Sequence, residues 1–298
     1  MYSKNNFGDI LKKFLTTNDN KTREDISKRK KANTKNTNEI KVEPNIKVSE
    51  TKSKPTKKEK TNKEYDASKE FMKKFKQLTY NHNSLDVWRD FIIMFACSIA
   101  NACDKTYFDE REKMYLDIIN KYKKEEQAIF PELCANVVMS LDDNLEQDFL
   151  GKIYMDLGLG NQNRGQFFTP YHLCQFMAGV TCMDSISKAK NQGVITIHDS
   201  CCGAGATLIA GVNEVKKELE KENMNFQNHL LVTGQDVDMT VALMCYIQIS
   251  LLGVAGYVKV GNSLTEPMCV NDDKRNYWYT PIYFSDIWTM RRIFKNLM

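Results

Sequence analysis

Two glycines lie where a short apolar run gives way to a helical pattern. The run at 194–198 ends in the motif His-Asp-Ser-Cys-Cys-Gly-Ala-Gly-Ala, which contains Gly203 and Gly205. Glycine leaves room for a ligand to approach the backbone, and a helix N-terminus offers free amide donors. An ordinary strand-to-helix turn also uses glycine. The motif therefore indicates a cofactor site only if neighbouring residues support one.

Two further apolar runs end in polar residues that suit a nucleoside. The run at 230–233 leads to Asp236, roughly 30 residues after the glycines, where a carboxylate can accept hydrogen bonds from ribose hydroxyls. Asp238 is better placed to begin the next helix. The run at 257–260 leads to Asn262, whose side-chain amide could bind the edge of an adenine ring. Three successive runs thus end in groups that fit one ligand.

A polar loop upstream ends in Thr169-Pro170 before a helical pattern at 171–177. Thr169 fits the N-cap position of that helix, with Pro170 as its first residue. Taken alone, this capping role is the simpler interpretation. The same hydroxyl and the free amides beside it could also hold the carboxylate of an amino-acid cofactor, so both roles stay open.

The elements that must position these residues alternate between strand and helix. Such alternation predicts right-handed βαβ units and a parallel, doubly wound sheet, in which ligands bind at the carboxyl ends of the strands. The expected strands are 194–198, 230–233 and 257–260, and the expected helices are 206–221 and 239–252. The fold class is therefore α/β, a truncated Rossmann-like sheet.

The first half of the chain differs in composition. Residues 1–66 hold 18 Lys and Arg against 10 Asp and Glu, and 17–66 are dominated by Lys, Thr, Asn, Glu and Ser. Such a segment buries too little apolar surface to offset its ordering entropy, so we expect a disordered tail. It could contact DNA or serve only as a solubilising tether. Helical periodicity predicts a small helical subdomain at 67–159, which leaves 160–298 as the cofactor-binding domain.

Several classes of protein are disfavoured by the composition. No apolar run approaches the roughly 18 residues that span a bilayer, so no membrane association is expected. The nine cysteines are odd in number, and none is spaced as Cys-x-x-Cys. We therefore expect reduced thiols, a cytoplasmic protein and no metal site.

In these motifs the chain resembles the N6-adenine DNA methylases, especially the methylation subunits of type I restriction-modification systems. The family's Asp-Pro-x-Cys-Gly-x-Gly looks like 199–205, with Ser200 in place of proline, and Gly-Gln-Phe-Phe-Thr-Pro at 165–170 is similar to its upstream signature. The resemblance implies an S-adenosylmethionine-dependent methyltransferase domain. By the same resemblance, the cofactor-binding residues would be Gln166, Phe168, Thr169, Pro170, Asp199, Cys202, Gly203, Gly205, Asp236 and Asn262.

The chain departs from the family at the catalytic motif. In the family an Asn-Pro-Pro-Tyr or Asn-Pro-Pro-Phe loop binds the adenine amine and stacks on the flipped base. The nearest segment here is Thr280-Pro281-Ile282-Tyr283, in which Thr280 could accept one hydrogen bond and Tyr283 could stack. Thr280, Pro281 and Tyr283 are therefore the only catalytic candidates.

The residues after the third strand leave room for only part of the family's sheet and for no target-recognition domain. The resemblance thus implies DNA methylation together with a specificity subunit or another restriction-modification subunit. The alternative is a catalytically inactive accessory or regulatory module that still binds S-adenosylmethionine.

Overall fold

A computed structural model describes residues 66–160 and 168–295 of the chain. The tail predicted at 1–66 lies outside the described residues except for Asp66, and so does the predicted cofactor residue Gln166. Within the described ranges, no helix has both the length and the apolar character needed to cross a membrane. The same ranges contain no cluster of three His, Cys, Asp or Glu side chains arranged for a metal ion.

The first part of the structure is helical. An aromatic cluster lies at its centre, where the Trp88 ring packs 6.0 Å from both Phe71 and Phe91. Asn83 begins the longest helix by accepting the backbone N–H of Leu85 at 2.9 Å. The helices are α3 (Ala67–Leu78), α4 (Ser84–Cys103), α5 (Phe108–Ile119), α6 (Lys124–Gln127), α7 (Ile129–Asp143) and α8 (Phe149–Asp156).

The second part contains a four-stranded sheet in the order β1-β2-β3-β4. β1 (Ile195–Asp199), β2 (Leu230–Asp236) and β3 (Ala255–Val260) are parallel, whereas β4 (Tyr277–Tyr279) pairs antiparallel with β3. The mixed α/β fold is therefore confirmed. The three predicted strands are present, and β4 is an addition whose direction matters for the site.

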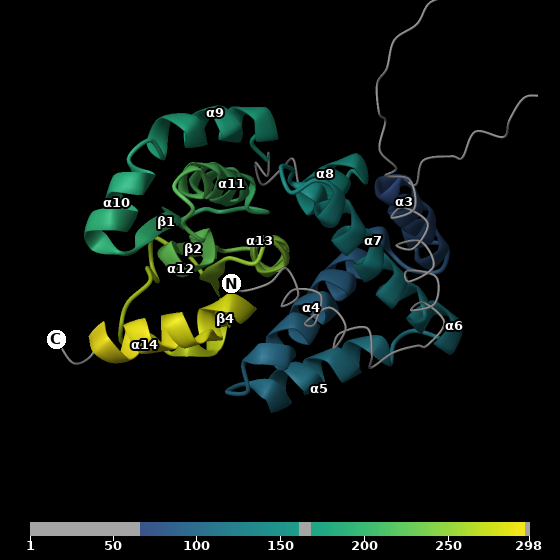
Figure 1. Cartoon of the computed structure of the whole chain (residues 1–298). Coiled ribbons are helices and arrows are strands. Elements are labelled where there is room, and N and C mark those ends of the chain that lie inside the picture. The colour runs from purple at the N-terminus through teal and green to yellow at the C-terminus, as the bar shows by residue number, and fades with distance from the viewer. Residues whose placement is uncertain (1–65, 161–167, 296–298) are drawn as a thin grey trace, which may run out of the picture.

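Helices α11 and α13 pack against the strands, and α9 packs on the outer side of α11 (Figure 1). The prediction for α11 matches the structure, and α13 ends one residue earlier than predicted. The helices of this part are α9 (Tyr171–Thr181), α10 (Ser185–Gln192), α11 (Ala206–Lys221), α12 (Phe226–His229), α13 (Met239–Leu251) and α14 (Asp286–Lys295), with the short 3-10 turns η2 (Lys274–Asn276) and η3 (Pro281–Phe284).

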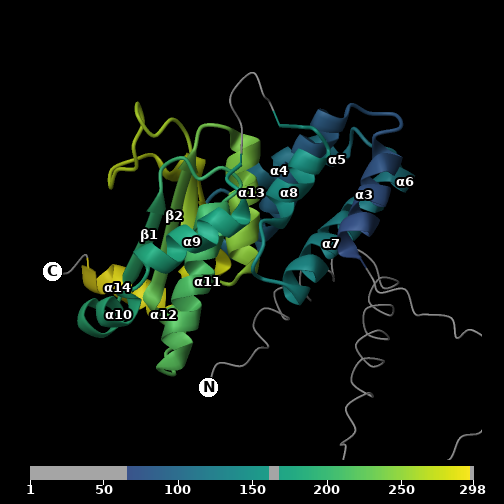
Figure 2. The same ribbon diagram turned by 90° about the horizontal axis from the view of Figure 1, so that it is seen from above.

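Helix α13 lies between the sheet and the helical part (Figure 2). It is buried all round, from Val241 to Leu251, because it packs on β3 on one side and on α4 on the other. One hydrophobic core therefore runs through both parts of the molecule. The division into domains at 67–159 and 160–298 stays a prediction.

A buried ion pair also joins the two parts. The Arg111 guanidinium on α5 donates to Asp104 Oδ2 at 2.9 Å and to the carbonyl of Tyr277 on β4 at 3.4 Å. Both charged side chains are almost fully buried, so the attraction between them offsets the cost of removing each charge from water. This ion pair thus links the helical part to β4, the antiparallel strand at the side of the sheet.

Candidate functional site

The turn between β1 and α11 contains the two predicted glycines. Gly203 has a φ of +54° and Gly205 a φ of +97°, which L side chains adopt only with strain. Asp199 holds the turn, since its Oδ1 accepts the N–H of Cys201 at 3.0 Å and its Oδ2 accepts the Thr207 hydroxyl. The carboxylate of Asp199 therefore stabilises the conformation of the turn by hydrogen bonds to its two sides.

Gly205 is required by packing against α13. A Cβ at this position would lie 2.8 Å from Cys245 Sγ, which is closer than Cβ atoms approach, and 3.3 Å from the Cys245 Cα, which is a tight contact. Gly203 differs, because a Cβ there would meet only the Phe168 ring, at 3.5 Å. Of the two glycines, Gly203 is therefore the one that lies against the segment 168–170, which was also predicted to bind the cofactor.

The end of β2 is in direct contact with the glycine turn. Asp236 Oδ2 accepts the backbone N–H of Gly203 at 2.9 Å, and its Oδ1 accepts the N–H of Asp238 at 3.0 Å. Burial raises the pKa of Asp236, and the charges of Asp238 and Asp199 act in the same direction. Asp238 caps α13 through the N–H of Thr240 at 2.9 Å, which confirms its predicted role.

The loop after β3 lies beside the loop after β2. Gly261 donates its N–H to the carbonyl of Asp236 at 2.9 Å, so Asn262 follows β2 closely in space. The Asn262 Oδ1 accepts the N–H of Leu264 at 2.9 Å, and the Ser263 hydroxyl lies 3.8 Å from Cys201 Sγ. The loops after β1, β2 and β3 therefore meet at one edge of the sheet, as predicted for parallel strands.

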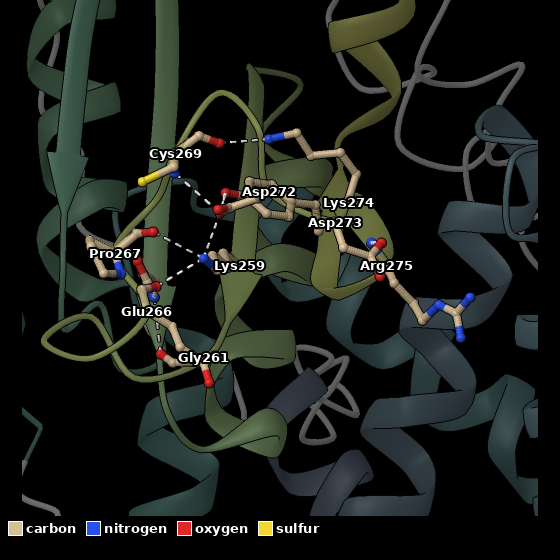
Figure 3. Close-up of polar contacts among 11 residues, drawn as sticks. Lys259, Gly261, Glu266, Pro267, Cys269, Asp272, Asp273, Lys274 and Arg275 are labelled. Atoms are coloured by element: carbon tan, nitrogen blue, oxygen red, sulfur yellow. Dashed lines mark hydrogen bonds and ion pairs between the residues drawn. The ribbon is translucent and has the colours of Figure 1, made fainter.

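A buried lysine supports the loop that follows β3 (Figure 3). Lys259 Nζ pairs with Asp272 Oδ2 at 2.6 Å and donates to the carbonyls of Glu266 and Pro267 at 2.8 and 3.1 Å. This pairing, followed by the hydrogen bond from Tyr277, lowers the pKa of Asp272. A lysine between two valines in an apolar strand is the sequence signal for this network, which was not predicted from the motifs.

The upstream segment differs from the prediction. The cap position of α9 is Pro170 and the helix begins at Tyr171, so Thr169 lies one residue before the cap. The capping role predicted for Thr169, with Pro170 as first helical residue, is therefore wrong. The Phe168 ring lies 5.7 Å from the Tyr154 ring and against Gly203, which brings this segment to the glycine turn.

Cys202 points into the core. It is buried, and its Sγ lies 3.1 Å from the position of a Cβ on Gly234 of β2. A hydrogen bond with Cys245, followed by burial, raises the pKa of its thiol. Its side chain is thus part of the packing beneath the turn.

The three catalytic candidates lie elsewhere. Thr280 is 0% exposed, and its hydroxyl accepts the N–H of Gly256 at 2.9 Å and donates to the carbonyl of Val254 at 2.8 Å. Both partners are at the amino end of β3, opposite the edge that carries Asp236. Because β4 runs antiparallel to β3, the residues after it return to that far edge.

Pro281 and Tyr283 follow Thr280 into η3, where Tyr283 stacks on Tyr279 with ring centroids 4.8 Å apart. The Arg292 guanidinium lies 4.2 Å from the centre of the Tyr283 ring. These contacts make Tyr283 part of an aromatic cluster beside α14. The structure therefore does not bring Thr280, Pro281 or Tyr283 to the glycine turn.

Comparisons with known proteins place the chain in a family by its sequence. The sequence model of the N-6 DNA methylase family matches residues 146–297, more than half of the chain. No curated protein matches the sequence. Among solved structures, the chain is similar to the crystal structure of a putative class I S-adenosylmethionine-dependent methyltransferase from Listeria monocytogenes.

That structure is 14% identical and has a TM-score of 0.36, over 70% of this chain and 56% of the other. The chain thus spans little more than half the length of that methyltransferase. The overall likeness is low, and the relationship rests on the family match, which begins at Glu146 just before α8 and includes the glycine turn and Asp236. The chain belongs to the N-6 DNA methylase family.

Proposed function

We propose that this protein binds S-adenosylmethionine at the loops after β1, β2 and β3 and acts in adenine-N6 methylation of DNA together with a partner. The observation that carries the proposal is the hydrogen bond from Gly203 to Asp236, which joins two of the predicted motifs directly. Phe168 adds a third by its contact with Gly203.

The residues at this edge fit the cofactor chemically. Each oxygen of Asp236 accepts one backbone N–H, and a carboxylate oxygen has a second lone pair for a ribose hydroxyl. The carboxylates of Asp199, Asp236 and Asp238 lie around the turn, and negative charge attracts a sulfonium. The start of α11 supplies backbone amides for the methionine carboxylate.

The partner is proposed because the site needs groups that the described part of this chain does not bring there. Transfer to an adenine amine requires acceptors that hold the amine in line with the methyl group. Thr280 and Tyr283 lie at the opposite edge of the sheet. A specificity subunit or another restriction-modification subunit would then supply them and select the DNA.

The proposal is tested by incubating the full chain with methyl-labelled S-adenosylmethionine and mixed duplex DNA, with and without candidate partner subunits. We expect N6-methyladenine only with the matching partner, and none when Asp236→Ala replaces the unmodified chain. Absence of cofactor binding by the unmodified chain would refute the proposal outright.

A second candidate function is a cofactor-binding accessory or regulatory module. The burial of Thr280 between Gly256 and Val254 favours it, because that residue is then structural. The two candidates separate in one experiment: both require cofactor binding, and only the first yields methylated DNA. Cofactor binding without methyl transfer under any partner condition supports the module.

We also propose a reducing compartment, the cytoplasm. All nine cysteines are free, and six of them are buried. Mass spectrometry after thiol labelling under denaturing conditions should find nine reactive thiols in protein taken directly from cells.

A further inference from the structure

One glutamine connects the helical part to the glycine turn. Gln248 on α13 is 0% exposed, and its Nε2 donates to Asp148 Oδ1 at 2.7 Å and to the carbonyl of Ala204 at 2.9 Å. Its Oε1 accepts the N–H of Leu150 at 3.1 Å. A single buried side chain therefore bonds both the start of α8 and the residue between the two glycines.

The bond to Ala204 fixes a peptide plane in the turn. The carbonyl of Ala204 and the N–H of Gly205 belong to one planar unit and point in opposite directions. Gln248 donates to the carbonyl, and the N–H donates to the Cys202 carbonyl at 2.8 Å. With both ends bonded, the plane is held although the glycines on either side permit many conformations.

Asp148 holds Gln248 in the required orientation. It caps α8 by accepting the N–H of Gly151 at 2.9 Å, and its carboxylate fills the space that a Cβ on Gly151 would need, 2.0 Å away. Without Asp148, the amide of Gln248 would lose its second acceptor and could rotate. The orientation of the Ala204 carbonyl thus depends on the start of α8.

A second contact runs from α8 to the same turn. Tyr154, near the end of α8, packs 5.7 Å from both Trp88 and Phe168, and Phe168 lies against Gly203. The aromatic core of the helical part therefore reaches Gly203 by packing, while Gln248 reaches Ala204 by hydrogen bonding. The two contacts are independent and converge on adjacent residues.

We propose that Gln248, oriented by Asp148, is a positioning residue that sets the geometry of the glycine turn for cofactor binding. Because Gln248 is bonded to the start of α8, the helical part then controls cofactor affinity through that helix. Because coupling between sites is reciprocal, cofactor binding then favours one placement of α8. The effect on affinity rests on the function proposed above, whereas the effect on the turn does not.

Gln248→Leu tests the proposal, since it preserves bulk and removes the three bonds. We expect the dissociation constant for S-adenosylmethionine to rise roughly ten-fold, as follows when a buried hydrogen-bonding group loses its partner. We also expect faster hydrogen exchange in 202–208, with exchange in β2 unchanged. A general loss of stability would instead accelerate exchange in both segments.

The matched control is Gln227→Leu. Gln227 Nε2 donates to the carbonyl of Gly253 at 2.8 Å, so this variant also loses a glutamine-to-carbonyl bond, outside the glycine turn. It should leave both cofactor affinity and exchange in 202–208 unchanged. Equal effects of the two variants would overturn the proposal.

Asp148→Ser provides a second variant if Gln248→Leu does not fold. Serine can still cap α8 but is too short to reach Gln248, so exchange in 202–208 should again rise. Unchanged exchange in that segment overturns the positioning role. If the unmodified chain does not bind S-adenosylmethionine, the proposed function fails, and the exchange measurement still decides whether Gln248 positions the turn.

Discussion

The backbone N–H of Gly203 donates a 2.9 Å hydrogen bond to Oδ2 of Asp236. This bond joins the turn after β1 to the end of β2, although the two residues are separated in sequence by the whole of α11. It makes the carboxylate both a structural acceptor and the boundary of the proposed cofactor site.

Gly205→Val should disrupt the turn from within. The new Cβ would lie 2.8 Å from Cys245 Sγ at a φ of +97°, so steric overlap adds to backbone strain. We expect stability to fall by about 1–3 kcal/mol and cofactor binding to be lost. Urea unfolding and calorimetric titration measure the two effects, and an unchanged affinity would contradict the assignment.

Gly179→Ala is the control for that substitution. Gly179 lies in α9, and a Cβ there meets no atom within 4 Å. Alanine should raise stability by about 0.5–1 kcal/mol because glycine weakens a helix interior. Cofactor affinity should not change.

Cofactor affinity should depend on pH through Asp236. Burial raises the pKa of this carboxyl, so it takes up a proton above the usual range of an aspartate as the pH falls. The protonated carboxyl carries no negative charge to attract the sulfonium, and it accepts hydrogen bonds from ribose hydroxyls less well. Titrations at successively lower pH should therefore show affinity weakening as Asp236 takes up its proton, and Asp236→Asn should bind weakly with a flatter profile.

The strand ends could be predicted from the sequence because parallel strands place their carboxyl ends together. That rule alone brings Gly203, Asp236 and Asn262 to one edge. The direction of β4 could not be predicted in this way. Tyr277–Tyr279 gives no signal of its orientation, and the antiparallel pairing with β3 is what carries Thr280 to the far edge.

Other features depend on contacts between distant segments. Asp148 and Gln248 are one hundred residues apart, and neither lies in a motif with a chemical signature of its own. Thr-Pro favours Thr169 as the cap and Pro170 as the first helical residue, whereas α9 begins one residue later, with Pro170 at the cap position and no side-chain cap. Local pattern identified the elements, and tertiary packing decided these side-chain roles.

Thr280→Val should lower stability without affecting cofactor binding. Valine keeps the shape but leaves the N–H of Gly256 and the carbonyl of Val254 without their partner in the core. We expect a loss of about 1–3 kcal/mol in the free energy of unfolding, and Thr280→Ser should recover most of it. A fall in cofactor affinity for Thr280→Val would contradict the structural role.

Asp148 should make stability depend on pH. Burial raises its pKa in the folded state above the unfolded value, so its contribution to stability is complete below that unfolded value, near 3.8. The contribution is lost as the pH rises through the folded pKa. The stability of the unmodified chain relative to Asp148→Asn should therefore decrease as the pH is raised from 4, as followed by thermal unfolding. A constant difference would contradict the raised pKa.

Direct calorimetric titration of the full chain with S-adenosylmethionine tests the central claim. We expect saturable binding at one site, weakened at least roughly ten-fold in Asp236→Ala, because that substitution removes a half-buried acceptor for the ligand and for Gly203. No binding by the unmodified chain, or equal binding by Asp236→Ala, would contradict it.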